Sequence, residues 1–170
     1  ARRWKQISAF GAMLDPIADK AVVVIAIAAL FALFGFNVWI MVPATVILLR
    51  EVFISGLREY LGATAGLLQV TRLAKYKTFT QMIAVSVLFA QGLFEHYFGM
   101  QTMGMDRGMV GAILDGQEQD VLGLRWKFRG MLWSYYGGIG FLWLAAVLTA
   151  LSGIDYYRKA LPYLKDREGS

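Results

Sequence analysis

The chain has 170 residues, of which 58% are hydrophobic and 17% charged, whereas a soluble domain carries about 25% charged residues. This composition favours a membrane protein. Cysteine is absent, which excludes disulfides and thiolate metal sites, so we expect any metal ion to be held by oxygen. The net charge is +5, but long apolar segments separate the basic residues, which favours anionic lipid head groups or phosphates as partners and no nucleic acid.

The first long apolar run contains no charged residue from Ala21 to Leu49. As one helix it would reach about 43 Å, against a hydrocarbon core of about 30 Å. The run therefore predicts two membrane spans. A break at Gly35-Phe36-Asn37 gives helices over about residues 13–34 and 38–60.

Two further apolar stretches, about residues 75–94 and the uncharged segment between Arg129 and Asp155, are each long enough to cross a membrane. The predicted fold class is all-α, a polytopic transmembrane helix bundle with four spans in a single membrane domain over residues 1–170. Residues 95–129 mix Gly, Met, Asp and Gln without clear periodicity, and we expect them to form a long extracytoplasmic loop.

The positive charges are distributed unevenly across these predicted spans. Of the 17 basic residues, all but four fall on one side; the exceptions are Arg107, Arg125, Lys127 and Arg129. The positive-inside rule therefore predicts that both termini and the loop over residues 62–74 are cytoplasmic.

Two carboxylates stand at the start of the first span. Gly11, Asp15 and Asp19 are spaced four residues apart, so on a helix they share one face. A carboxylate within a membrane costs about 2.5–3.5 kcal/mol even on insertion scales, so we expect a function for this pair. Two hard oxygen ligands on one helix suit Mg²⁺ or Mn²⁺, ions that retain water and share substrate phosphates.

A structural role for the same pair is the alternative. Pro16 fits best in the first turn of a helix, where its missing N–H is of little consequence. In that case Asp15 caps the helix, and Asp19 pairs with Lys20 or Arg2 in the head-group layer. Spacing alone does not separate the two interpretations.

Charged residues also interrupt the second span, at Arg50-Glu51 and Arg58-Glu59. Intramembrane charges usually face a bundle interior or an aqueous cavity, so we favour a polar pocket open to the cytoplasm over an internal ion pair. Lys75 and Lys77 are either ordinary flanking charges of the third span or part of the same pocket. Several cations beside a carboxylate metal site suit a substrate that carries a phosphate.

The N-terminal spacing resembles a family signature. Ala1-Arg2, eight residues, Gly11, three residues, Asp15, three residues and Asp19 match the second half of D-x2-D-G-x2-A-R-x8-G-x3-D-x3-D, the signature of the CDP-alcohol phosphotransferases. Within this family, the sequences around Asp15–Lys20, Arg50–Glu59 and Lys75–Ala84 most resemble bacterial members that use sn-glycerol 3-phosphate. The resemblance covers residues 1–84 well and the remainder only as hydropathy.

This resemblance implies a six-helix enzyme of the bacterial inner membrane, a homodimer with its active site facing the cytoplasm. It implies transfer of the phosphatidyl group from CDP-diacylglycerol to sn-glycerol 3-phosphate, giving phosphatidylglycerol phosphate and CMP in phospholipid synthesis. Four aspartates of the family hold two divalent cations, Mg²⁺ or Mn²⁺, against the diphosphate.

Residue by residue, Asp15 matches a metal ligand, and Asp19 matches the carboxylate that serves as general base and lies near the metal. Gly11 matches the glycine that permits close approach, and Arg2 matches the arginine near the nucleotide phosphates. For the acceptor phosphate we predict the four basic residues Arg50, Arg58, Lys75 and Lys77.

The first two aspartates and the first glycine of the signature would fall before Ala1, together with the first helix and most of the second. We therefore expect the 170 residues alone to be inactive. The alternatives are another acceptor in the same family (inositol phosphate, serine or a phospholipid), a transporter or channel with Asp15 and Asp19 as its ion site, and a non-catalytic membrane scaffold.

Overall fold

The structure of the protein is a computed structural model that describes residues 9–67 and 73–168. Every regular element of this part of the chain is helical, and it contains no strand. The elements are α1 (Ala9–Phe34), α2 (Val38–Leu61), the short 3-10 helix η2 (Gly62–Leu67), α3 (Leu73–Thr102), α4 (Arg107–Asp115) and α5 (Leu124–Glu168). The predicted all-α class is confirmed.

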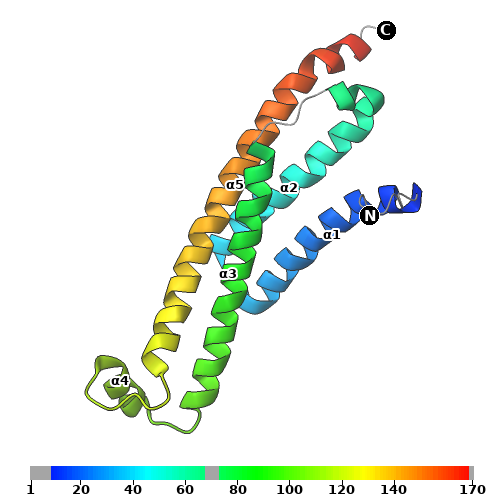
Figure 1. Cartoon of the computed structure of the whole chain (residues 1–170). Helices are drawn as coiled ribbons and strands as arrows, with labels where there is room; N and C mark the ends of the chain where they lie inside the picture. Colours follow the sequence, from blue (N-terminus) through cyan, green and yellow to red (C-terminus); the bar gives the residue numbers. More distant parts are fainter. Residues whose placement is uncertain (1–8, 68–72, 169–170) are drawn as a thin grey trace.

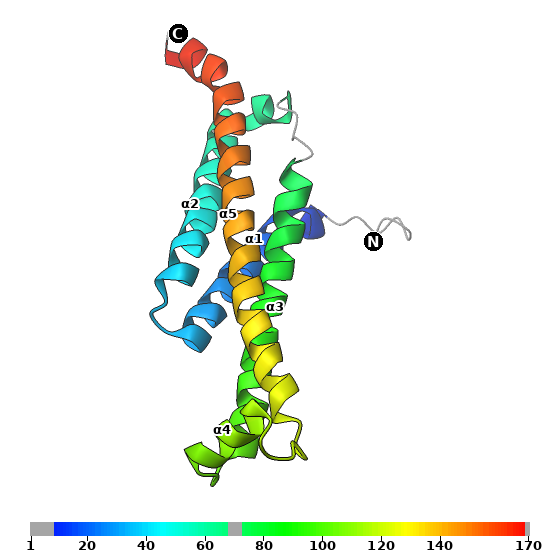
Figure 2. The same cartoon turned by 90° about the vertical axis from the view of Figure 1, so that its left-hand side faces the viewer.

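The helices form an elongated bundle around α5. Both views show α3 alongside α5, with α2 packed on the part of α5 nearer the C-terminus (Figures 1 and 2). Helix α1 lies close to the bundle where it joins α2 and diverges from the bundle toward its N-terminal end (Figure 1). The small helix α4 lies at the end of the bundle opposite the C-terminus.

The α3–α5 interface is close because small residues line it. On α3 the buried residues Gln81, Ala84 and Leu88 recur at three- and four-residue spacing, as expected for one face of a helix. Opposite them on α5 lie Gly138 and Ala145. A Cβ atom at Gly138 would stand 2.6 Å from Cγ of Leu88, so only glycine allows the two helices to approach this closely.

The predicted break at residues 35–37 is confirmed. Gly35 adopts a φ of +59°, a left-handed conformation that glycine adopts without strain. Asn37 then caps α2, because its side-chain oxygen accepts from the backbone N–H of Trp39 at 3.0 Å. Its amide nitrogen donates to the Tyr135 hydroxyl at 2.7 Å, which attaches the turn to α5.

Two boundaries differ from the sequence prediction. Helix α1 begins at Ala9, so Pro16 lies inside the helix and not in its first turn, and Asp15 is too far from the start to cap it. Residues 95–129 are not one long loop, because α3 continues to Thr102, α4 covers residues 107–115 and α5 begins at Leu124. Helical hydrogen bonding continues there beyond the apolar stretches.

Two of the described helices are long and apolar enough to cross a membrane, namely α2 over Val38–Leu61 and α5 over Leu124–Leu164. A shorter apolar segment covers Lys20–Phe34. The composition of α3 is more polar, and its polar residues Thr80, Gln81 and Gln91 are buried inside the bundle.

Candidate functional site

Arg50 occupies an interior position of α2. Ile47, Ile54 and Leu61 recur every seventh residue on one face of this helix and are buried. Arg50 falls on the same face, between Ile47 and Ile54, where a packed helix would ordinarily carry an apolar side chain. Its guanidinium Nη2 donates to the Ser152 hydroxyl of α5 at 3.2 Å. The bundle therefore holds this cation from the side of α5.

Gly153 of α5 makes room for the arginine. A Cβ atom at this position would lie 2.9 Å from Cγ of Arg50 and 3.4 Å from its Nε. Since Cγ is close to the backbone, the arginine could not accommodate a larger residue by moving only its tip. The glycine thus allows the Arg50 side chain to pass between α2 and α5.

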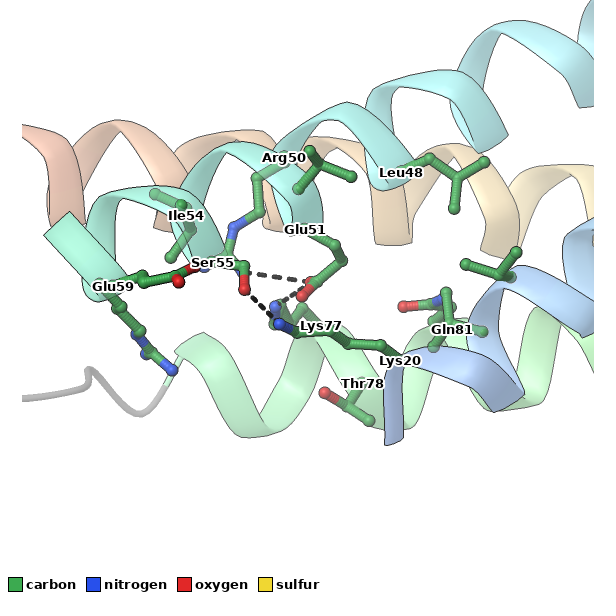
Figure 3. Close-up of a pocket in the computed structure, with 15 residues that line it drawn as sticks. Lys20, Leu48, Arg50, Glu51, Ile54, Ser55, Glu59, Lys77, Thr78 and Gln81 are labelled. Atoms are coloured by element: carbon green, nitrogen blue, oxygen red, sulfur yellow. Dashed lines mark hydrogen bonds and ion pairs between the residues drawn. The ribbon is translucent and has the colours of Figure 1, made fainter. Parts of the chain in front are cut away.

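Glu51 pairs with two cations from different helices. Its Oε1 accepts from Arg50 Nη1 at 3.1 Å and also from Lys77 Nζ of α3. The side chains of Arg50 and Lys77 are 12% and 10% exposed, whereas that of Glu51 is 27% exposed. Figure 3 shows Glu51 between α2 and the lysine of α3. Both expectations for Arg50–Glu51, a pocket and an ion pair, therefore describe the same site.

A cavity of about 900 Å³ opens beside this cluster between α1, α2 and α3 (Figure 3). Such a volume is within the usual range of small-molecule sites. The charged residues that line it are Lys20, Arg50, Glu51, Arg58, Glu59 and Lys77, and the uncharged polar ones are Ser55, Thr78 and Gln81. The four cations outnumber the two carboxylates, so the lining favours an anionic ligand.

The remaining two cations of the cavity contact neutral groups. Lys20 of α1 donates to the Ser55 hydroxyl of α2, which joins the two helices across the cavity (Figure 3). Arg58 lies over the ring of Tyr156 on α5, with its guanidinium carbon 5.1 Å from the ring centroid. Such cation–π contacts orient an arginine without neutralising its charge.

Asp15 and Asp19 precede Lys20 in α1, and Lys20 is the first residue of this helix that lines the cavity. Residues four apart in a helix share a stripe, so positions 15 and 19 continue the stripe of Val23, which lines the cavity. Their side chains lie outside the described residues. Among the side chains that the structure describes, no three His, Cys, Asp or Glu residues group as metal ligands.

The structure brings together part of the predicted site. Arg50, Arg58 and Lys77 line one cavity, as expected of an acceptor-phosphate site. Lys75 lies in the first turn of α3, but its side chain is outside the described residues. Gly11 lies in α1, whereas Arg2 precedes the described part of the chain. The roles of these residues stay predictions.

Sequence reasoning did not assign Lys20, Ser55, Ser152 or Gly153 to the site. Lys20 has a signal, since it follows Asp19 and precedes an uncharged run. Ser152 and Gly153 lie in an apolar segment of α5, where small residues are common, so their contact with Arg50 has no signature in sequence spacing.

Comparison with known proteins identifies the family to which these residues belong. The family model described as CDP-alcohol phosphatidyltransferase matches residues 1–114. A curated relative from Cereibacter sphaeroides is 48% identical over 99% of this chain and 76% of its own length. Relatives from Rickettsia felis and Escherichia coli strain K12 are 31% and 30% identical, over 96% and 98% of this chain and 70% and 71% of their own lengths.

All three relatives are named CDP-diacylglycerol--glycerol-3-phosphate 3-phosphatidyltransferase. No solved structure matches the chain. The family match covers the aspartate spacing of α1 and the cationic cluster of α2 and α3, and the similarity to the Cereibacter sphaeroides relative extends through α5. The resemblance seen in the sequence is thus confirmed, and the chain belongs to the CDP-alcohol phosphatidyltransferase family.

Proposed function

We propose that this protein transfers the phosphatidyl group of CDP-diacylglycerol to sn-glycerol 3-phosphate, which yields phosphatidylglycerol phosphate and CMP in phospholipid synthesis. The observation that carries the proposal is the cavity lined by Lys20, Arg50, Arg58 and Lys77; its first lining residue, Lys20, directly follows Asp19 in α1. Both substrates are phosphate anions, and the relatives are named for this reaction.

In the proposed reaction, a hydroxyl oxygen of glycerol 3-phosphate attacks the phosphorus that bears the diacylglycerol. A new P–O bond forms to the acceptor, the P–O bond to the bridging oxygen breaks, and CMP leaves with that electron pair. Asp19 accepts the hydroxyl proton. Transfer of this kind depends on positioning and charge neutralisation more than on covalent catalysis by the protein.

Asp15 and Asp19 fit a site for Mg²⁺ or Mn²⁺, because carboxylates one helical turn apart supply the hard oxygen ligands that these ions prefer. In the family pattern two such ions share four aspartates. When bound, they would neutralise charge on the diphosphate. The interior position of Asp15 within α1 removes the capping alternative and supports this role.

We assign the remaining predicted site residues to one or the other of the two substrates. We assign Arg50, Arg58, Lys75 and Lys77 to the phosphate of the acceptor, and Arg2 and Gly11 to the nucleotide side. Burial of Lys77 and Arg50 supports their part of the assignment, because a cation fixed by packing loses less conformational entropy when it binds an anion.

The proposal includes four membrane spans in the bacterial inner membrane, with the cavity facing the cytoplasm. For α3, burial of Thr80, Gln81 and Gln91 supports a span, since the exposed side then carries Phe79 and Leu93. Because the chain has no cysteine, single cysteines introduced at Gly66 and Met103 can be labelled with an impermeant maleimide. We expect labelling of Gly66→Cys only after the membrane is opened and labelling of Met103→Cys in intact spheroplasts.

A homodimer is also part of the proposal. Gly137 and Gly140 of α5 have no neighbouring atoms where a Cβ would stand, and small residues on an outer helix face permit close approach of a second helix. Crosslinking at these two positions in membranes tests it.

The activity is tested by CMP release from CDP-diacylglycerol in membranes that express the gene with any coding sequence before Ala1. Glycerol 3-phosphate, inositol phosphate and serine are offered separately, with and without a divalent cation. We expect release that needs glycerol 3-phosphate and the cation, and that falls by at least about a hundredfold in Asp15→Asn. Membranes that carry Asp155→Asn, a change in the exposed ion pair with Lys159, serve as the control.

Release with inositol phosphate or serine instead would keep the family chemistry and change the acceptor. No release with any acceptor, from protein present in the membrane at normal amounts, would contradict the proposal and favour a transporter or scaffold.

A further inference from the structure

Glu51 faces the cavity in front of the two cations that it neutralises. Its carboxylate is more exposed than the side chains of Arg50 and Lys77 behind it, at 27% against 12% and 10%. Figure 3 shows the carboxylate at the cavity, between α2 and the end of Lys77. Any anion that reaches Arg50 and Lys77 from the cavity therefore meets Glu51 first.

A carboxylate and a phosphate present the same chemistry to these donors. Both offer anionic oxygens that accept charge-assisted hydrogen bonds from guanidinium and ammonium groups. Oxygen Oε1 of Glu51 accepts from both cations at once, as one phosphate oxygen could. Arg50 also keeps a buried Nε without a hydrogen-bond partner among the described residues, so this arginine has donor capacity beyond its present contacts.

The cavity thus contains two kinds of cation. Lys20 contacts a serine hydroxyl and Arg58 contacts a tyrosine ring, and both keep their full charge toward the cavity. Arg50 and Lys77 are neutralised by the same carboxylate. An entering phosphate can approach the first pair directly, but it must replace Glu51 to contact the second.

We propose that Glu51 is an internal competitor for the acceptor's phosphate: its carboxylate holds Arg50 and Lys77 in position in the free protein and is displaced when the phosphate binds. This inference rests on the proposed function only for the identity of the acceptor. Glu51 lowers the affinity for phosphate and in return keeps two buried cations paired when the site is empty. It also speeds release of a phosphate-bearing product by returning to the same donors.

The test measures binding of inorganic phosphate and of sn-glycerol 3-phosphate to the full chain in detergent micelles by titration calorimetry at constant ionic strength. In Glu51→Gln the side chain keeps nearly the same size and loses its charge. We expect both ligands to bind about 3- to 10-fold more tightly, the range for removal of one competing charge at a partly exposed site.

Glu59→Gln is the matched control. Glu59 lines the same cavity and is exposed, but it forms no ion pair with a described cation. This variant removes the same charge without freeing Arg50 or Lys77, so we expect a change of less than about twofold in affinity. Equal tightening in both variants would overturn the inference, because pocket charge alone would then explain the effect.

A second variant keeps the inference testable if Glu51→Gln does not fold. Glu51→Asp keeps the charge but is one methylene shorter, which withdraws the carboxylate from Lys77. We expect tightening of about twofold here, since only the pairing to Arg50 persists. Unchanged or weaker phosphate binding in the folded variants, or no binding of either ligand by the wild type, would overturn the inference.

Catalysis supplies an independent measurement. In Glu51→Gln we expect the KM for glycerol 3-phosphate to fall and kcat to fall with it, because product is released more slowly. Tighter phosphate binding without any CMP release in the wild type would refute the proposed function and leave the role of Glu51 as an anion competitor intact.

Discussion

The two ends of the bundle use the same charged residue types in different ways. At the cavity end, Arg50, Lys77 and Glu51 pair with one another beside an open volume. At the opposite end, Arg125 donates to the backbone carbonyls of Ile113 and Glu118 at 2.6 and 2.9 Å. There the charged side chain satisfies backbone carbonyl groups in the connection between α4 and α5.

This difference separates structural charges from charges available to a ligand. The carbonyl oxygens bound by Arg125 belong to the backbone of the α4–α5 connection, and that of Ile113 also accepts from the Gly116 N–H, so the contact stabilises this connection. Neither carbonyl belongs to a residue that lines the cavity. A carboxylate paired with two cations at a cavity wall can be replaced by another anion without loss of hydrogen bonds. We therefore expect a bound ligand to change side-chain contacts at the cavity end and to leave the contacts at the far end unchanged.

The largest contrast should come from one lysine at each end. Lys77→Gln removes a cation that we assign to the acceptor phosphate, and a hydrogen bond to a charged group contributes about 1.5–3 kcal/mol. We expect the KM for glycerol 3-phosphate to rise about 10- to 100-fold. It is measured by CMP release at saturating CDP-diacylglycerol.

Lys127→Gln is the counterpart at the far end, where the ammonium donates to the Gln101 side chain at 2.6 Å and to the Leu122 carbonyl. We expect an unchanged KM. If the two variants raised KM equally, the distinction between the ends would be lost.

Local chemistry explains which parts of the fold were predictable. The α1–α2 break was predictable because Gly35 and Asn37 supply a left-handed residue and a cap within three positions. The cavity was predictable in outline because Arg50 and Glu51 interrupt an apolar helix. In both cases the signal lies in the residues that form the feature.

The remaining features depend on contacts distant in sequence. Hydropathy ends a span at the first charges, whereas α3 continues through Glu95 and α5 begins before Lys127, so helix ends in residues 95–129 were misplaced. Arg50 meets Ser152 and Gly153 across more than a hundred residues. Nothing in the local pattern of α5 distinguishes this glycine from the others.

The α3–α5 interface joins the two ends, and its closeness can be tested at Gly138. Gly138→Leu would place a Cβ 2.6 Å from Cγ of Leu88 and 3.3 Å from its backbone nitrogen. Overpacking of this kind costs about 1–3 kcal/mol, so we expect a lower melting temperature in micelles. At Gly99 of α3 a Cβ meets nothing within 4 Å, and we expect Gly99→Leu to melt close to the wild type. The interface would be looser than described if both variants melted alike.

Gly153 tests whether α5 positions the arginine of the cavity. Gly153→Ala adds a Cβ 2.9 Å from Cγ of Arg50, which must shift the side chain toward the cavity. We expect a three- to tenfold loss in kcat/KM, the equivalent of about 1 kcal/mol of overpacking. Gly140→Ala lies on the same helix, adds a Cβ that meets nothing within 4 Å in this chain, and keeps a small residue where we propose that a second helix approaches, so it should leave kcat/KM unchanged. A similar loss in Gly140→Ala would indicate a general effect on α5.

We expect the smallest effect on stability at the far end of the bundle. There a change of pH, and not the binding of a ligand, alters the hydrogen bonds. The carboxylate of Asp120 accepts from the backbone N–H groups of Arg125 and Leu124 at 3.0 and 2.6 Å. These hydrogen bonds favour the charged form and lower the pKa of Asp120 below its ordinary value. A lowered pKa in the folded state means that the carboxylate stabilises the start of α5 above the unfolded pKa of about 4.

That stabilisation is lost as the pH falls through the lowered pKa. We expect the fluorescence of the tryptophan residues, which include Trp126 beside this cap, to show a small step below about pH 4 that is absent in Asp120→Asn. Asp106→Asn removes a carboxylate that caps α4 instead, through Gly108 N–H at 3.0 Å, and should keep the step. Phosphate binding at pH 7 should be the same in both variants, because neither carboxylate belongs to the cavity. A change in that binding would mean that the far end communicates with the site through α3 and α5.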